Sequence, residues 1–220
     1  MPVAIRRHPR ARRFVLRVSG GVIQLTIPTR ARQGDALNWA QEQHKFIEQE
    51  LTSEPDAVPL AMDAVLPVLG QTVRVVPGLL TTGDFSGETL AIAPGPSGAV
   101  ADRLERCLRR LVLAASEADL RECWASLGVP EAEVTVRAYQ RRWGACAHDG
   151  RTAINWRLVF APREVLRYVC AHEAAHRIEM NHSSRFWSVV ERLMPDYRQH
   201  EAWLRDHGKQ LSAYGPPEAD

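Results

Sequence analysis

The sequence lacks an apolar run long enough to span a membrane as a helix, which takes about 20 residues. Residues 1–20 contain arginines but no continuous apolar segment of the kind that marks a secretory signal. We therefore expect a cytoplasmic protein that does not bind a membrane. The composition, with 45% hydrophobic and 25% charged residues in a chain of 220, is typical of a globular protein with one large or two small domains.

Cysteine is scarce, and none of the four cysteines belongs to a CxxC pair. They are Cys107, Cys123, Cys146 and Cys170. The missing CxxC spacing argues against a zinc knuckle, and a reducing compartment disfavours structural disulfides. We expect these side chains to be buried thiols.

Acidic residues are absent from the start of the chain, where Asp35 is the first. The net charge of the whole chain is only +2, so positive charge is concentrated in this basic opening. Its arginines are Arg6, Arg7, Arg10, Arg12, Arg13, Arg17, Arg30 and Arg32. Such a field attracts the phosphates of nucleic acid or an acidic protein surface. Because aromatic residues do not alternate with these arginines, the pattern favours a solvated strand face whose arginines protect a sheet edge.

The first part of the chain predicts a small α+β region rich in β-hairpins. Residues 14–18 and 22–27 are β-rich runs, and the Ser-Gly-Gly sequence at 19–21 predicts the hairpin turn between them. Asp35 is placed to cap a helix whose apolar stripe runs to Leu51 and covers one face of the sheet. Short strands are predicted next, at residues 65–69, 72–76 and 89–92.

A Pro- and Gly-rich stretch at residues 94–98 predicts a linker. We therefore divide the chain into an N-terminal region, residues 1–98, and a second domain, residues 99–220. The second domain opens with a helix predicted from about residue 100 to 127 and ended by Gly128.

The second domain then predicts a strand, a hairpin and three helices. The strand covers residues 134–139, and Asp149-Gly150 predicts a hairpin turn between apolar runs at 143–147 and 152–158. The helices have recognisable start and stop signals. These are Pro162 at the start of the first, Ser183 or Ser184 as the cap of the second, and Pro195-Asp196 and Gly208 at the two ends of the last.

The residues that carry chemistry form the HExxH segment from His172 to His176. Side chains at positions i and i+4 of a helix lie one above the other, so both imidazoles would point at one metal ion. Glu173 is rotated away from that axis, which places its carboxylate to take a proton from water and not to bind the metal. The spacing is typical of zinc hydrolases.

The third ligand has three candidates. The imidazole of His182 can reach the metal only if the chain leaves the helix first, and Asn181 tolerates the left-handed conformation that ends helices. Glu179 lies on the helical face of the two histidines, and Glu191 on the next predicted helix offers a carboxylate from outside. The pattern favours His182, although catalytic zinc accepts three histidines or two histidines with a carboxylate.

A series of short motifs follows in a specific order along the second domain. They are Arg142-Trp143-Gly144-Ala145-Cys146, Asn155-Trp156, Tyr168-Val169-Cys170-Ala171 before the HExxH segment, Asn181-His182-Ser183, Phe186-Trp187 and Pro195-Asp196-Tyr197. In this order they resemble the YgjP-like metallopeptidase family, which is related to SprT-like proteases. The resemblance is strong over residues 134–204, and the basic opening, hairpin and first helix also look like that family.

Two positions depart from the family pattern. Ala145 stands where the family usually has Ser, and Ala174 stands where it usually has Leu. Neither is a ligand, so the departures leave the metal site intact. Metzincins share the ligand spacing, but they have Gly at the position of Glu179. The glutamate here disfavours the interpretation that the chain is a metzincin.

The resemblance implies an α+β fold, with a zincin-like catalytic domain built on the HExxH helix and preceded by a small, hairpin-rich α+β part. It implies Zn²⁺ bound by His172, His176 and His182, with Glu173 as catalytic acid and base. The expected activity is hydrolysis of a polypeptide, whose extended segment would pair with the hairpin of residues 143–156.

The alternative is a zinc-binding module without turnover, associated with nucleic acid through the basic opening. A closed structural site would need a fourth ligand, and Cys146 is the candidate nearest in character. Glu173 favours the enzyme, because a structural site needs no base. Tyr168 lies one turn before His172, and we expect it to pack in the core and not to act on substrate.

Overall fold

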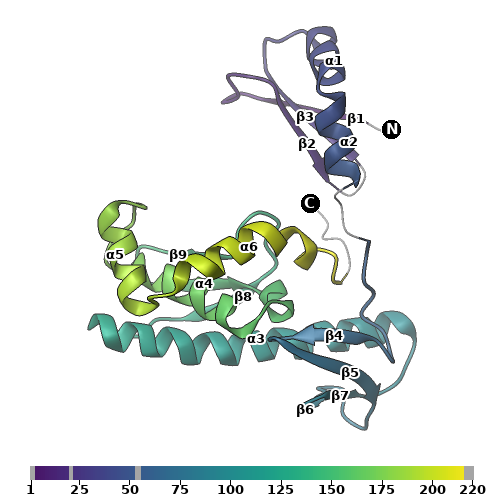
Figure 1. Cartoon of the computed structure of the whole chain (residues 1–220). Helices are drawn as coiled ribbons and strands as arrows, with labels where there is room; N and C mark the ends of the chain where they lie inside the picture. Colours follow the sequence, from purple (N-terminus) through teal and green to yellow (C-terminus); the bar gives the residue numbers. More distant parts are fainter. Residues whose placement is uncertain (1–2, 20–21, 53–55, 216–220) are drawn as a thin grey trace. The chain divides into compact units, whose positions relative to one another are not determined.

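A computed structural model of the chain describes residues 3–19, 22–52 and 56–215 (Figure 1). The chain divides into two compact units, Met1–Asp56 and Ala57–Asp220. The boundary predicted after residue 98 lies inside the second unit, because the strands before it share one hydrophobic core with the long helix after it. Within the part of the chain that the structure describes, no helix is long and apolar enough to cross a membrane.

The first unit is a three-stranded sheet, in the order β1-β3-β2, with two helices. Its elements are β1 (Val3–His8), β2 (Val15–Ser19), β3 (Val22–Pro28), α1 (Gln33–Glu42) and α2 (His44–Thr52). Strands β2 and β3 are antiparallel, which confirms the predicted hairpin, although Gly20 and Gly21 of its turn lie outside the described residues. The sequence does not predict β1, which pairs with β3 in parallel.

The core of the first unit lies between β3 and α1. Leu25, Ile27 and Ala36 are completely buried there. The sequence predicted that Asp35 caps the helix, and that is wrong. The N-cap is Arg32, and Asp35 lies in the first turn. The helix is also interrupted at Gln43 instead of running on to Leu51, so α1 and α2 are separate.

The second unit holds two sheets and a set of helices, which confirms the predicted α+β class. Its sheets have the strand orders β4-β5-β7-β6 and β8-β10-β9. Strand β6 is the one the sequence does not predict. The elements are β4 (Val65–Val68), β5 (Gln71–Pro77), β6 (Asp84–Ser86), β7 (Thr89–Ile92), α3 (Ser97–Leu127), β8 (Val134–Arg137), β9 (Gly144–Cys146), β10 (Thr152–Asn155), the 3-10 helix η1 (Trp156–Phe160), α4 (Arg163–Ala175), α5 (Ser184–Leu193) and α6 (Tyr197–Leu211).

Two boundaries in this unit differ from the prediction for physical reasons. The strand expected to reach residue 158 ends at Asn155, whose side chain accepts a hydrogen bond from the backbone N–H of Arg157 at 3.2 Å and caps η1. Helix α6 does not end at Gly208. A Cβ at that position would lie 3.0 Å from the ring of Trp143, so Gly208 leaves room for the indole within the helix.

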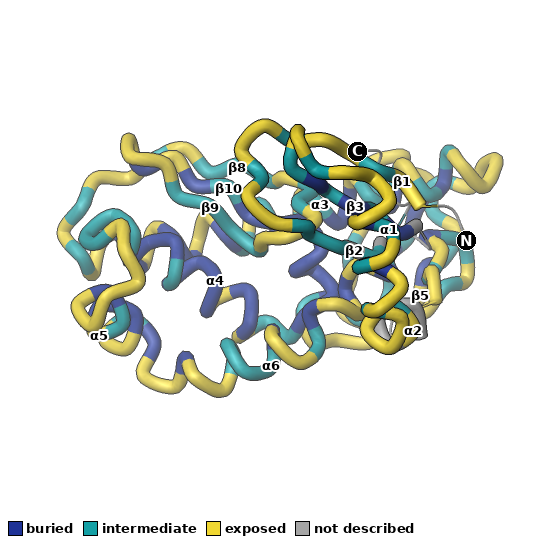
Figure 2. The backbone as a smooth tube through the Cα atoms, turned by 90° about the horizontal axis from the view of Figure 1, so that it is seen from above, coloured by how far each residue is buried: buried dark blue, intermediate teal, exposed yellow. Residues whose placement is uncertain are grey.

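Helix α4 carries the HExxH segment through the middle of the second unit, and Figure 2 shows it buried along most of its length. Arg163 at its first position donates two hydrogen bonds of 2.6 Å to the carboxylate of Asp119 on α3. Asp119 is only 5% exposed. A bidentate, charge-assisted pair of this kind holds planar groups in one geometry, so it ties the start of α4 to α3.

Candidate metal centre

Three histidines meet at the C-terminal end of α4. Ring nitrogens of His172, His176 and His182 all lie within 4.8 Å of one another. The Nε2 atoms of His172 and His182 are 3.0 Å apart. Because Zn–N bonds measure about 2.0–2.1 Å, tetrahedral zinc holds its nitrogens about 3.4 Å apart. The cluster therefore has the size that a single small metal ion needs.

His182 reaches the cluster because the helix ends before it. The last α-helical residue is Ala175, and His176 is the C-cap. Asn181 was predicted to end the helix in a left-handed conformation, and that is wrong. Among the described residues, the non-glycine residues with positive φ are Asp63 and Leu69. The chain leaves the helix through a turn after His176 in ordinary backbone conformations.

Helix α5 begins directly after His182. Its N-cap is Ser183, as the sequence predicted, and the Ser183 hydroxyl accepts a hydrogen bond from the N–H of Phe186 at 3.4 Å. An N-cap side chain satisfies a backbone donor that the helix itself leaves free. The loop that carries His182 is thus held between the end of α4 and a capped helix start.

The other proposed ligands have different partners. Glu179 contributes its backbone, because its carbonyl oxygen lies 3.2 Å from Nδ1 of His176 and can accept the proton there. That bond leaves Nε2 of His176 for a metal, which is the usual arrangement around ligating histidines. Glu191 lies 4.0 Å from Arg198, and Cys146 contacts the carbonyl oxygen of Ala147. In the described residues the cluster contains none of these three side chains.

Phe186 of α5 supports the three rings from the protein interior. It is completely buried, and its ring centroid lies 4.9, 4.6 and 4.7 Å from those of His172, His176 and His182. Burial of a phenylalanine side chain contributes about 1.5–3 kcal/mol, so this support is stable without a metal. The sequence indicated Phe186 as part of the Phe186-Trp187 motif of the family resemblance, and its place beside the three histidines was missed.

The aromatic residues Tyr168, Trp156 and Trp143 pack in or against the core. Tyr168 is 5% exposed, stacks on Tyr197 with centroids 6.4 Å apart, and meets the edge of His172 at 6.0 Å. Burial raises the pKa of its hydroxyl. Trp156 belongs to the core at 1% exposure, and Trp143 is half-buried against that core. Tyr168 therefore packs, as predicted, and restrains the ring of His172.

The surroundings of His172 and His176 disfavour their protonation. Burial, and after it the neighbouring His176 and His182, lower the pKa of His172 to about 3. Burial also lowers the pKa of His176. Metal ions bind the unprotonated imidazole. The environment therefore keeps these two rings in the form that a metal requires.

Glu173 is a buried acid beside strand β9. Its side chain is enclosed, with 5% of the residue exposed, and burial raises its pKa to about 8, while Arg142 acts in the opposite direction. A Cβ at Gly144 would lie 2.6 Å from Cγ and 2.7 Å from Cδ of Glu173. Only glycine at this position lets the strand approach the carboxyl group so closely.

A helix with an HExxH segment and a third histidine from the following loop is the arrangement of the metal-dependent hydrolases. The family described as YgjP-like, metallopeptidase domain, matches residues 12–207. The chain therefore belongs to the YgjP-like metallopeptidase family, and the protein is a metallopeptidase. This agrees with the resemblance seen in the sequence.

Two solved structures are similar to part of the chain. The metallopeptidase zymogen abylysin of Pyrococcus abyssi is 26% identical, with 43% of this chain and 93% of that chain covered and a TM-score of 0.38. The metallopeptidase zymogen jannalysin of Methanocaldococcus jannaschii is 19% identical, with 43% and 96% covered and a TM-score of 0.37. No curated protein sequence matches the chain.

The contact between Gly144 and Glu173 predicts a specific effect of Gly144→Ala. The new methyl group would occupy the space of the Glu173 carboxyl and displace it, so peptide hydrolysis should fall at least about tenfold while metal content stays unchanged. Kinetics and metal analysis of the same preparation would measure this. Gly98→Ala is the matched control, because a Cβ at Gly98 meets nothing within 4 Å. Equal activity of the two variants would contradict the prediction.

Glu173 also predicts how the stability of the metal-free protein depends on pH. With its pKa raised from 4.5 to about 8, the folded state keeps a proton that the unfolded state releases above pH 4.5. Wild-type stability should therefore fall relative to Glu173→Gln between pH 4.5 and 8, by up to about 1.4 kcal/mol per pH unit. Urea unfolding with a chelator present measures the difference. Glu164→Gln, on an exposed position of the same helix, should show no such trend.

Proposed function

We propose that this metallopeptidase binds one Zn²⁺ through His172, His176 and His182. The observation that carries the proposal is the convergence of their ring nitrogens within 4.8 Å beside a buried carboxyl group. Three neutral imidazoles suit zinc, and a set of three protein ligands leaves a position open for water and substrate. That open position is the mark of a catalytic site.

Glu173 is the proposed proton carrier. When bound, Zn²⁺ supplies a Lewis acid that polarises the scissile carbonyl and makes water a stronger acid. The Glu173 carboxylate takes a proton from the attacking water and later gives it to the leaving amine. The positive charge of Arg142 lowers the pKa of Glu173 against the effect of burial. A bound Zn²⁺ nearby would also lower this pKa, because a positive charge favours the ionised carboxylate. Glu173 can therefore serve as a base near neutral pH.

The proposed substrate is an extended polypeptide that pairs with strand β9. This strand is at the edge of its sheet, where β10 is its neighbour on one side. No strand among the described residues pairs with its other side. An open edge presents backbone donors and acceptors to an added strand. Since Gly144 in β9 also adjoins Glu173, a peptide paired there would lie close to the proposed base. A cytoplasmic location is part of the proposal and rests on the sequence alone.

The ligand set predicts which substitutions remove the metal. His182→Ala should lose most of about one Zn²⁺ per chain, because two imidazoles hold zinc much more weakly than three. Glu179→Ala should keep the metal, since the main chain of Glu179 makes the bond to His176 and its side chain is not required. Elemental analysis after gel filtration measures both. Metal retained in His182→Ala and lost in Glu179→Ala would mean that the ligand set is wrong.

The proposed base predicts that Glu173→Gln keeps zinc and fold but cuts hydrolysis about 10²-fold or more, the scale of general-base loss. The amide preserves the shape of the side chain and cannot accept the proton. Cleavage of an unfolded polypeptide is the measurement, with Glu164→Gln as the control on the same helix. If both variants cleave at the wild-type rate, Glu173 is not the base. If zinc-loaded wild type shows no turnover, a zinc-binding module without catalysis is the better account.

A further inference from the structure

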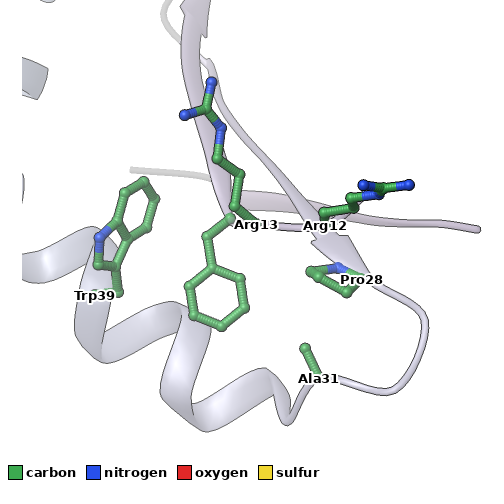
Figure 3. Close-up of a pocket in the computed structure, with 6 residues that line it drawn as sticks. Arg12, Arg13, Pro28, Ala31 and Trp39 are labelled. Carbon is green, nitrogen blue, oxygen red and sulfur yellow. The ribbon is translucent and has the colours of Figure 1, made fainter. Parts of the chain in front are cut away.

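A pocket of about 520 Å³ lies in the first unit, and the peptidase proposal makes no use of it. Figure 3 shows Trp39 of α1 on one side, Pro28 and Ala31 on the other, and Arg12 and Arg13 on the chain that leads into β2. Phe14 completes the lining, with its ring 5.8 Å from that of Trp39. Both aromatic rings are half-buried, so part of each is open to solvent.

The arginines around this pocket are exposed and have no carboxylate partner. Acidic residues are absent before Asp35, and the described residues offer no ion pair to the guanidinium groups near the pocket. Arg12 and Arg13 line the pocket, and the chain neighbours of its lining residues include the exposed Arg10, Arg30 and Arg32. Exposed like charges that are not neutralised within the protein raise the local potential and attract anions.

A further exposed arginine lies on the sheet itself. The register of β1 and β3 places His8 beside Pro28, which lines the pocket, and Arg6 beside Thr26. These positions alternate with Leu25 and Ile27, which face the core, so they lie on the opposite face of the sheet. Arg6 is exposed there. Arg6 therefore lies on the face of the sheet opposite Phe14 and Trp39, which pack against that core.

We propose that this pocket and its arginines bind single-stranded nucleic acid. One base would lie against Trp39 and Phe14, and the neighbouring phosphates would lie on Arg12 and Arg13. Proteins that hold single strands without sequence preference combine a positive groove with aromatic platforms. The sequence supplied the arginines but no alternating aromatic residues. Folding brings Trp39 of α1 to the arginines that precede β2, which completes this pair of features.

The pairing of rings with arginines favours nucleic acid over an acidic peptide. A strand of nucleic acid offers a phosphate and a flat base at every unit, so both parts of the surface are used together. An acidic peptide would use the arginines and leave the aromatic lining without a partner. The two ligands therefore differ in whether removing the flat group weakens binding.

The first experiment measures how much the arginines contribute to binding through their charge. Full-length protein is titrated with a fluorescent single-stranded oligonucleotide at increasing salt, and anisotropy gives the affinity. Arg12→Gln with Arg13→Gln should flatten the slope of log K against log salt by about 1.4, the value for two lost phosphate contacts on a single strand. Arg106→Gln with Arg192→Gln, two exposed positions of the second unit, should keep the wild-type slope. No binding at low salt, or equal slopes for the two double variants, overturns the proposal.

The second experiment measures stacking, and its first arm needs no protein variant. An abasic oligonucleotide of equal length and charge should bind about 5- to 150-fold more weakly, the range for loss of a base on an aromatic platform. Trp39→Ala should weaken binding of the normal oligonucleotide by a similar factor, while Phe46→Ala, 45% exposed on α2, should not. Equal binding of the abasic and normal strands, or equally tight binding of poly-glutamate, overturns the proposal in favour of a general anion surface.

Discussion

The close packing of helix α4 against strand β9 is the contact on which the position of the Glu173 carboxyl group depends. Glu173 faces the strand at the one position, Gly144, where the absence of a side chain leaves room for a carboxyl group. The same contact removes the carboxyl from water, which is why burial raises its pKa. A carboxyl group enclosed in this way is held in one orientation, as the proposed proton carrier must be.

The histidine cluster is supported mainly by apolar and backbone groups. Phe186 lies against all three rings, and the carbonyl oxygen of Glu179 accepts from His176. Burial lowers the pKa of both His172 and His176, while the bond to the Glu179 carbonyl acts in the opposite direction on His176. A site prepared before the metal binds loses less conformational freedom on binding. The short loop between α4 and α5 can therefore carry a ligand without being part of a helix.

The polar side chains that matter for the two proposals are buried in the second unit and exposed in the first. In the second unit the buried Asp119 pairs with Arg163, and the buried Asn155 side chain caps η1. The first unit leaves its arginines exposed around an aromatic pocket. Buried polar groups need partners to offset lost hydration, whereas exposed charges cost little and act on ligands. The second unit thus carries the proposed catalytic site, and the first carries the surface proposed to bind nucleic acid.

The sequence by itself determined the family, the α+β class, the helix with the HExxH segment, the hairpins and the cap at Ser183. These features depend on neighbours along the chain, through side-chain periodicity and turn residues. Only the tertiary structure decided the rest. Contacts between distant segments place Trp39 in the same pocket as Arg12, and they place Phe186 against the histidines. Gly208 lies within a helix, where the absence of its side chain leaves room for Trp143. Such contacts join residues far apart in the chain, so no local pattern could signal them.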